Sequence, residues 1–333
     1  MNEDGIIHST QEMMMKTIAV LGARGRVSRV VARTFLDRNW RVIAVTRDGK
    51  LPQGLARAEG RSADAMDQAA LIAACRGADV IFNGLNPVYT DWAEIVPVFT
   101  ANVIAAAKAT GALHLLAGNV YNYGRSIPAI ADETTPMPGD TGKGMIRNAM
   151  EKTFERAAGD GVKTTIVRAG DFYGGDGRGA WFDLGITVKL DKGIFTWPGA
   201  MDIDHAWAYL PDLAETFVKI AETGGDGSGF ATYTFEGHTL SGTQMKKLIE
   251  KALGGKSLKR SSIPWLLLRA AGLVVPKWRE VVEVSYLWFT PHRLSGKRLE
   301  AAIGPLAKTS PDTAIAEALA ELGFATTKSN LVA

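Results

Sequence analysis

Residues 17–47 read TIAVLGARGRVSRVVARTFLDRNWRVIAVTR: an apolar run, a glycine turn, an amphipathic segment and a second apolar run. The β-branched run at 17–21 predicts a strand. Apolar residues then recur at helical spacing, at Val27, Val30, Val31 and Phe35. Residues 42–45 predict another strand. The segment therefore predicts one βαβ unit, which opens a dinucleotide-binding fold.

The glycine turn suits a bound phosphate. Gly22 permits the tight bend, and Gly25 lets the main chain approach a pyrophosphate at the helix N-terminus. Ser28 takes the third position of the G-x-x-G-x-x-G pattern, where a small residue serves helix–strand packing. We expect Arg26 and Val27, in the same turn, to contact the cofactor. The alternative is an ordinary turn in a sheet protein that binds no nucleotide.

The residue after the second predicted strand bears on the choice between NAD and NADP. NAD-binding folds usually carry an acidic residue there for the ribose hydroxyls, whereas this chain has Arg47, which suits a 2′-phosphate. Arg24, inside the turn, could bind the same phosphate. Asp48 follows one residue late, and both arginines could simply be solvated. We favour NADP, with NAD as the alternative.

Strands and helices alternate along the rest of the chain. Further strands are predicted at 57–61, 79–83, 113–117, 163–168 and 233–235, and helices at 68–75, 92–110, 144–158, 204–221 and over most of 241–322. This alternation predicts an α/β Rossmann fold, a doubly wound parallel sheet with helices on both faces. We expect a disordered tail at 1–15 and a dinucleotide-binding domain at 16–175, to which 205–237 returns. A smaller, mainly helical substrate lobe would comprise 176–204 and 238–333.

Residues just after the later strands are candidates for the cofactor site. Asp64 and Ala65 follow the third strand, where Asp64 could accept a hydrogen bond from the adenine amino group. Alternatively, Asp64 or Asp67 caps the next helix. Gly84, after the fourth strand, would allow close approach to the cofactor, and we expect Gly170, after the sixth, to contact it.

Composition excludes several classes of partner. The chain has 333 residues, is 46% hydrophobic and 22% charged, and carries a net charge of +3, as a globular enzyme would. It has no Lys/Arg run of the kind that binds nucleic acid, and no His/Cys/carboxylate spacing that suggests a metal. The longest apolar stretch, 263–275, contains Arg269 and is too short to span a bilayer, so we expect no membrane partner. The single Cys75 excludes an intrachain disulfide, suggests a buried small hydrophobe and fits a cytoplasmic location.

A glycine-rich loop precedes a group of aromatic residues. Four glycines within 174–179 predict a mobile loop. Trp181, Phe182, Phe195 and Trp197 follow it. These rings could line a substrate pocket or form a small satellite core, and the sequence leaves both interpretations open.

Four segments carry a resemblance to a known family: GARGRV from Gly22, NVYNYG ending at Gly124, VRAGDFYGG from Val167, and YLPDLAE from Tyr209. With these segments, the chain resembles the extended short-chain dehydrogenase/reductase superfamily, the NAD(P)-dependent epimerase/dehydratase group. The family uses a Ser or Thr after the fifth strand and a Tyr-x-x-x-Lys motif on the next helix. The resemblance places Asn119 at the Ser/Thr position, Lys143 at the Tyr position and Arg147 at the Lys position. The usual catalytic tyrosine is therefore absent.

Lys143 and Arg147 are four residues apart and share one helical face with Glu151. They could be a solvated row of charges. As functional groups, Arg147 would bind the nicotinamide ribose or a phosphate, and Lys143 would lie near the substrate. Lys143 could polarise a carbonyl there, or move a proton if Arg147 lowers its pKa. Asn119 could donate to a developing oxyanion.

A tyrosine hydroxyl could be supplied from another position. The candidates are Tyr89, Tyr121, Tyr123 and Tyr173, of which we include Tyr123 in the predicted catalytic set. His114 and His205 are expected to be structural.

These features predict an NADP-dependent oxidoreductase that transfers a hydride to a small carbonyl or quinone-like substrate. Its partner would be that small molecule, and a homodimer is compatible with the sequence. Two alternatives stay open: a non-catalytic NADP-sensing regulatory protein, and a sugar-nucleotide epimerase or dehydratase.

Overall fold

The computed structural model describes residues 15–225, 227–306 and 308–325. Of the predicted tail at 1–15, only Met15 is among them, so that prediction lies outside the described residues.

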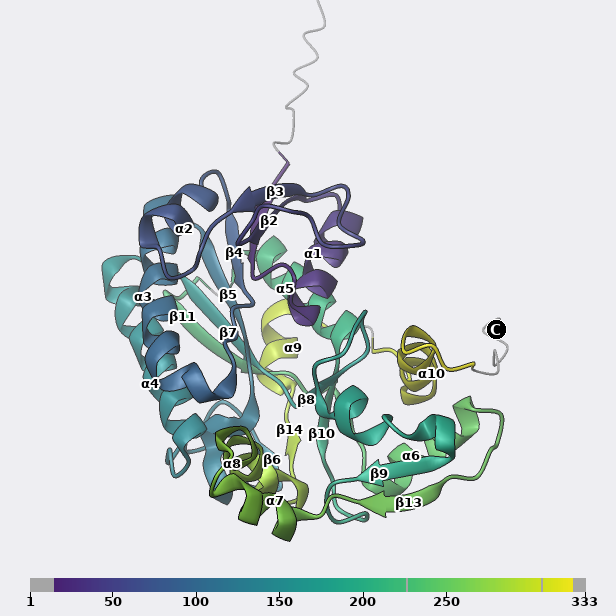
Figure 1. Cartoon of the computed structure of the whole chain (residues 1–333). Helices are drawn as coiled ribbons and strands as arrows, with labels where there is room; N and C mark the ends of the chain where they lie inside the picture. The colour runs from purple at the N-terminus through teal and green to yellow at the C-terminus, as the bar shows by residue number, and fades with distance from the viewer. Residues whose placement is uncertain (1–14, 226, 307, 326–333) are drawn as a thin grey trace, which may run out of the picture.

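A seven-stranded sheet forms the centre of the molecule (Figure 1). Its strands are β1 (Thr17–Leu21), β2 (Arg41–Thr46), β3 (Glu59–Ser62), β4 (Val80–Asn83), β5 (Leu113–Gly118), β7 (Thr164–Arg168) and β11 (Phe230–Thr234). They lie in the order β11-β7-β5-β4-β1-β2-β3, and every neighbouring pair is parallel. The predicted Rossmann sheet is therefore confirmed, and a crevice is expected at the carboxyl ends of β1 and β4, where the strand order reverses.

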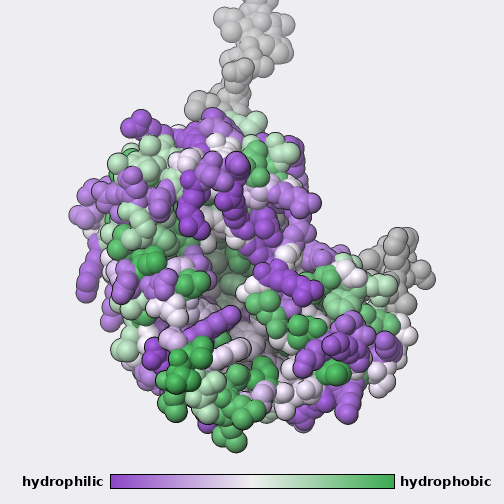
Figure 2. Space-filling model, in the orientation of Figure 1, coloured by the Kyte–Doolittle hydropathy of each residue, from purple (hydrophilic) through white to green (hydrophobic). Residues whose placement is uncertain are grey.

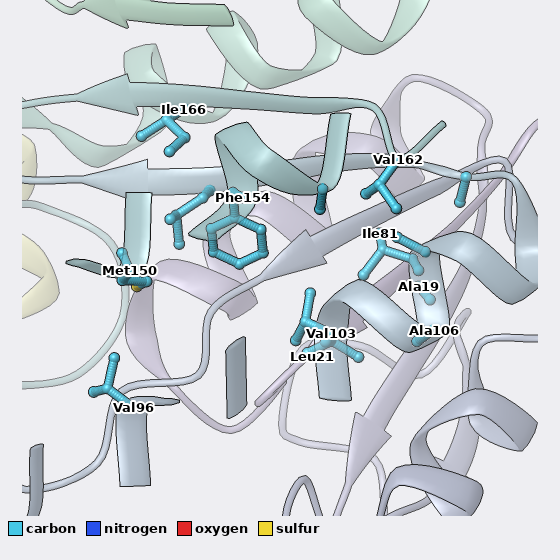
Figure 3. Close-up of a cluster of buried hydrophobic side chains, with 14 of the residues drawn as sticks. Ala19, Leu21, Ile81, Val96, Val103, Ala106, Met150, Phe154, Val162 and Ile166 are labelled. Carbon is cyan, nitrogen blue, oxygen red and sulfur yellow. The ribbon is translucent and has the colours of Figure 1, made fainter. Parts of the chain in front are cut away.

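Helices cover both faces of this sheet (Figure 1). One layer consists of α2 (Gln68–Ala74), α3 (Trp92–Thr110) and α4 (Gly142–Ala157), and the other of α1 (Arg26–Asp37), α5 (Leu210–Thr223) and α9 (Lys297–Ile303). The alternation of buried residues along β1 supplies both cores, because Ala19 and Leu21 point to the first layer and Ile18 and Val20 to the second. Figure 3 shows the first core, in which side chains of α3 and α4 pack on the sheet.

A lobe packs beside the carboxyl end of the sheet. It contains the parallel pair β9 (Ile194–Trp197) and β13 (Lys259–Ser262), together with α6 (Gly242–Ala252) and α10 (Pro311–Glu321). A three-stranded sheet of β8 (Asp171–Tyr173), β10 (Ala206–Tyr209) and β12 (His238–Thr239) lies between the lobe and the main sheet. Two short helices, α7 (Trp265–Gly272) and α8 (Pro276–Glu283), form a hairpin below α4 (Figure 1).

Short elements complete the described chain. They are the strand pair β6 (Ile130–Ala131) and β14 (Arg293–Leu294) and the short helices η1 (Tyr89–Asp91), η2 (Val120–Ser126), η3 (Ala158–Asp160), η4 (Phe182–Ile186), η5 (Leu190–Lys192) and η6 (Val284–Trp288).

Three predictions need correction. Residues 206–209, expected to be helical, form β10 because they pair with β8 and β12, and the helix begins only at Leu210. The strand β13, within the region expected to be mainly helical, forms by pairing with β9. The segment 293–303 does not belong to the lobe, because β14 pairs with β6 and Leu299 of α9 packs in the core under α5.

Candidate functional site

Two adjoining cavities follow the carboxyl edge of the main sheet. The Arg47 cavity, of about 440 Å³, is lined by the glycine turn and by residues after β2 and β3. The Arg147 cavity, of about 330 Å³, is lined by residues after β5 and β7 and by the start of the lobe. Both share Gly25 and the segment 84–86, so together they form one cleft. Figure 2 shows this face hollowed near its middle.

All twelve residues predicted to bind the cofactor line this cleft. Gly22, Arg24, Gly25, Arg47, Asp64, Ala65 and Gly84 line the Arg47 cavity, while Arg26, Val27, Asn119, Arg147 and Gly170 line the other, with Gly25 and Gly84 common to both. Binding itself stays a prediction, but the fold brings the whole set together.

The glycine turn has the geometry that a pyrophosphate needs. Gly22 is left-handed, with φ +61°, and a Cβ there would lie 3.2 Å from the carbonyl oxygen of Gly84. Gly25 precedes α1, and no side chain caps the first amides of that helix. Those amide groups can therefore donate to a phosphate.

Ser28 explains why Gly84 is a glycine. The Ser28 side chain is buried and its Oγ donates to the carbonyl of Leu21 at 3.1 Å. A Cβ on Gly84 would collide with the Oγ of Ser28. The packing role predicted for Ser28 thus fits the structure. Because Ser28 fills this space, the residue after β4 must be a glycine, Gly84.

The two acidic residues after β3, Asp64 and Asp67, have different hydrogen-bond partners. Asp67 caps α2, because its Oδ1 accepts from the amide of Ala70 at 3.0 Å. Asp64 accepts from the amide of Met66 at 2.9 Å and lies at the wall of the Arg47 cavity. The cap is therefore Asp67, which leaves Asp64 in position for the predicted adenine contact.

Arg24 is already paired. Its Nη2 lies 2.6 and 2.7 Å from the two carboxylate oxygens of Asp48, and both side chains are exposed. This guanidinium and the amide of Lys50 hold the pKa of Asp48 at about 2. Arg47, beside this pair, makes no salt bridge with any residue that the structure describes.

The predicted row on α4 is buried instead of solvated. Lys143, Arg147 and Glu151 are only 2%, 8% and 3% exposed. Of the three, Arg147 alone lines the cavity. The expectation that they share one face is correct, but each has a different partner.

Arg147 has no carboxylate partner among the described residues. Its guanidinium lies over the ring of Trp92, 4.5 Å from the centroid, and Nη1 lies 3.9 Å from the sulfur of Met150. Its Nε is buried without a hydrogen-bond partner in the described structure. Burial lowers the pKa of Arg147, while Tyr89, Glu151 and Tyr121 act in the opposite direction. An unpaired buried cation at a cavity wall is costly unless a ligand completes its hydrogen bonds.

The predicted role of Lys143 is not supported. Its Nζ donates to Glu280 Oε2 at 2.6 Å and to Glu283 Oε2 at 2.8 Å, and it does not line the cavity. Both carboxylates come from α8, some 140 residues further along the chain. Lys143 therefore ties α8 to the start of α4 and is not available to a substrate.

Two of the four candidate tyrosines lie in the cavity. Tyr89 and Tyr121 line it, and their hydroxyls are 3.1 Å apart. Burial, followed by the neighbouring Tyr89 and Asp171, raises the pKa of Tyr121 well above its ordinary value, so its hydroxyl stays protonated.

The other two tyrosines lie outside the cavity. Tyr123, in the predicted catalytic set, is fully buried and donates to the carbonyl of Asp132 at 3.1 Å, with a pKa that burial raises to about 12. Tyr173 is also buried, and its hydroxyl bonds His238. The catalytic role of Tyr123 is therefore not supported.

Asn119 lies at the cavity wall between β5 and η2. Its Oδ1 accepts from the amide of Tyr121 at 3.0 Å, which orients the side chain. Its Nδ2 makes no hydrogen bond to any described residue and can donate to a ligand. The contact between Asn119 and an oxyanion stays a prediction.

Sequence reasoning missed Asp171 and Trp92. Asp171 lines the cavity, and its Oδ2 lies 2.8 Å from Nε2 of His205. Trp92 also lines the cavity, and its ring packs against the guanidinium of Arg147. The sequence could have indicated Asp171 as a site residue, because it follows β7 and ligands bind at the carboxyl ends of parallel strands. Trp92 carries no comparable signal at the start of α3.

Three arginines of α1 hold the glycine-rich loop. Arg26 makes a buried ion pair with Asp183 at 2.6 Å. Arg29 donates to the carbonyl of Asp176 at 2.5 Å, and Arg33 pairs with the carboxylate of the same residue. Mobility of this loop stays a prediction, but any opening must break these contacts.

The aromatic group after this loop is mainly a core. Phe182, Phe195 and Trp197 are buried together with Tyr173 and Trp207, and only Trp181 lines the cavity. His114 is also structural: it bonds Thr164 Oγ1 at 3.2 Å, and burial lowers its pKa to about 3. Cys75 is buried, as expected, with a pKa that burial raises to about 12.

Comparisons with known proteins agree with this geometry. Residues 22–183 match the family model described as NAD(P)H-binding. The matched residues contain the glycine turn, the strand ends that line the two cavities, and the row on α4. No curated protein sequence matches the chain.

Solved structures show that the similarity in fold extends beyond the matched residues. UDP-glucose 4-epimerase from Brucella ovis, in complex with NAD, is 14% identical, with a TM-score of 0.73 over 94% of this chain and 100% of that one. The Bifidobacterium longum UDP-glucose 4-epimerase, in complex with NAD+ and UDP, is 17% identical, with a TM-score of 0.72 over 92% and 98%. WbmH from Bordetella bronchiseptica, in complex with NAD+, is 16% identical, with a TM-score of 0.71 over 93% and 98%. The resemblance to the epimerase/dehydratase group is confirmed for the fold.

Two further searches concern the described residues alone. None of their helices is long and apolar enough to cross a membrane. None of their His, Cys, Asp and Glu side chains forms a group of three or more that could hold a metal ion.

Proposed function

We propose that the protein is an NADP-dependent oxidoreductase that reduces a small carbonyl or quinone-like substrate in the Arg147 cavity. The observation that carries the proposal is the buried, unpaired guanidinium of Arg147 beside two hydrogen-bonded tyrosines. A cation and two phenols around one cavity suit a substrate oxygen that gains negative charge during reaction.

The chain's residues can divide this chemistry among them. NADPH, when bound along the glycine turn, supplies the hydride. Tyr121 donates its proton to the substrate oxygen, which becomes a hydroxyl, and the half-buried Tyr89 at 3.1 Å returns a proton to Tyr121. Arg147 and Asn119 Nδ2 donate hydrogen bonds that stabilise charge on that oxygen or hold the cofactor ribose. The raised pKa keeps the Tyr121 hydroxyl protonated, so it can donate a proton to a substrate oxygen that receives a hydride.

The direct test is NADPH oxidation at about 340 nm against quinones, aldehydes and ketones, with nucleotide-sugar turnover followed by chromatography. Arg147→Met should lower the reductase rate and weaken NADPH binding by about tenfold or more, because charged hydrogen bonds are lost. The same variant should raise the melting temperature, because it removes an unpaired buried charge. Lys152→Met, on the exposed face of α4, is the matched control. Nucleotide-sugar turnover without reductase activity would refute the proposal.

Cofactor preference gives a second prediction. Arg47 and Arg24 flank the Arg47 cavity, so NADPH should bind more tightly than NADH. Arg47→Ala should remove about 1.5–3 kcal/mol of that preference, the contribution of a charge-assisted hydrogen bond. Asp48→Asn should strengthen the preference, because it releases Arg24 from its ion pair. Calorimetric titration of both nucleotides measures each effect. Equal affinities in the wild type, or an unchanged ratio in Arg47→Ala, would assign the site to NAD.

A non-catalytic NADP sensor is the second candidate. It is favoured by Lys143, which the resemblance places at the position of the family's tyrosine and which two glutamates hold outside the cavity. A protein that binds NADPH and turns over none of the substrates would support this alternative.

A further inference from the structure

The α7–α8 hairpin exposes an apolar surface that the cleft does not explain. We name the hairpin surface by its residues: Leu266, Leu267, Leu273, Val274, Val275 and Trp278. Leu273 and Val274, at the turn between the helices, are 88% and 82% exposed, and Leu266 and Leu267 are 79% and 70% exposed. In Figure 2 hydrophobic side chains gather at the lower edge, over α7 and α8. Turns are normally polar, so this cluster indicates a partner.

The hairpin is firmly anchored, so its exposure is built into the fold. Trp265 is buried, and its Nε1 donates to the carbonyl of Pro198 at 2.5 Å. Gly272 allows the two helices to approach, because a Cβ there would lie 3.0 Å from the amide nitrogen of Arg279. Leu268 and Val281 pack inward on the lobe core. The remaining large apolar residues are thus directed away from the molecule.

Charge on the hairpin is sorted between its two sides. Glu280 and Glu283 turn inward, and both accept hydrogen bonds from the buried Lys143. Arg269, Lys277 and Arg279 are exposed. Arg279 lies 3.7 Å from Glu280 Oε1, but its side chain remains 70% exposed. The two helices that flank the apolar tip therefore carry three exposed cations.

We propose that the hairpin surface docks on an anionic phospholipid bilayer. Leu273 and Val274 would enter the boundary between headgroups and acyl chains, and the three cations would contact lipid phosphates. Trp278 suits the same boundary, because its amphipathic ring prefers the membrane interface. This proposal departs from our expectation of no membrane partner, which rested on 263–275 being too short to span a bilayer, because attachment to a surface needs no spanning segment.

A second copy of the chain fits this surface less well. In a two-fold symmetric dimer the same patch meets itself, so the cations of one copy would face those of the other. An anionic bilayer supplies both an apolar interior for the exposed leucine and valine side chains and negative charge for the cations of the hairpin.

The test is co-sedimentation of the full chain with vesicles of phosphatidylglycerol and phosphatidylcholine, or of phosphatidylcholine alone. We expect binding to the first and little to the second. The double variant Leu273→Asp/Val274→Asp should bind at least about tenfold more weakly, and Lys277→Glu/Arg279→Glu should lose the preference for anionic lipid. Leu51→Asp is the control, because Leu51 is also exposed but lies in the loop between β2 and β3, at the opposite end of the molecule (Figure 1).

All these side chains are solvent-exposed, so unchanged melting temperatures and NADPH binding should confirm that the variants fold. The assay requires no turnover, so it is independent of the proposed reductase activity. Two results would overturn the proposal: wild-type protein that sediments with neither vesicle, or an aspartate variant that binds as the wild type does. A wild-type dimer that the aspartate variant converts to a monomer, without vesicle binding, would assign the surface to a second copy.

Discussion

Tyr121→Phe is expected to lower the reductase rate by about 10²–10⁴-fold, the usual contribution of a positioned general acid. The substitution removes one oxygen from a buried ring and leaves the cavity shape unchanged. Because Tyr121 acts on the substrate oxygen, NADPH affinity should stay close to that of the wild type. Steady-state kinetics with the best substrate of the panel, together with calorimetric titration of NADPH, measures both quantities.

Tyr123→Phe is the matched control for this prediction. Tyr123 lies two residues away and is also buried, but its hydroxyl donates to the carbonyl of Asp132 outside the cavity. It should lose some stability and retain full activity. If Tyr123→Phe abolished the reaction and Tyr121→Phe did not, our assignment of the proton donor would be wrong.

Glu151→Ala is expected to destabilise the protein by about 3–5 kcal/mol, because removing one partner of a buried ion pair leaves the other charge uncompensated. Glu151 Oε2 lies 2.6 Å from Arg168 Nη2, and both side chains are less than 5% exposed, at 4% and 3%. Glu151 Oε1 also accepts from Asn122 Nδ2 at 2.9 Å. The variant therefore breaks a network that joins α4 to β7 and η2.

Urea denaturation of two further variants completes this test. Glu155→Ala, on the exposed face of the same helix, should change stability by less than about 0.5 kcal/mol. Glu151→Leu/Arg168→Leu should be less destabilised than Glu151→Ala, because it removes both charges together. If Glu151→Ala and Glu155→Ala had the same stability, the ion pair would contribute nothing to folding.

Local pattern in the sequence determined the main fold. The apolar run of β1, the glycine turn and the helical spacing of α1 act over neighbouring residues, so residues 17–47 alone specify a βαβ unit. The repeated alternation then implies a parallel sheet, and parallel strands place their carboxyl ends together. For that reason the predicted cofactor residues, drawn from seven separate segments, line one cleft, and all of these segments except that of Arg147 on α4 follow a strand of the main sheet.

Only the tertiary structure decided which side chains of the candidate catalytic set meet. Lys143 and Arg147 look equivalent on one helical face, but α8 brings two glutamates to Lys143 and none to Arg147. Tyr121 and Tyr123 are two residues apart on a short helix, and the packing around that helix puts one hydroxyl in the cavity and the other in the core. Contacts across such distances in sequence depend on how whole elements dock, and helical spacing or turn chemistry carries no information about that docking.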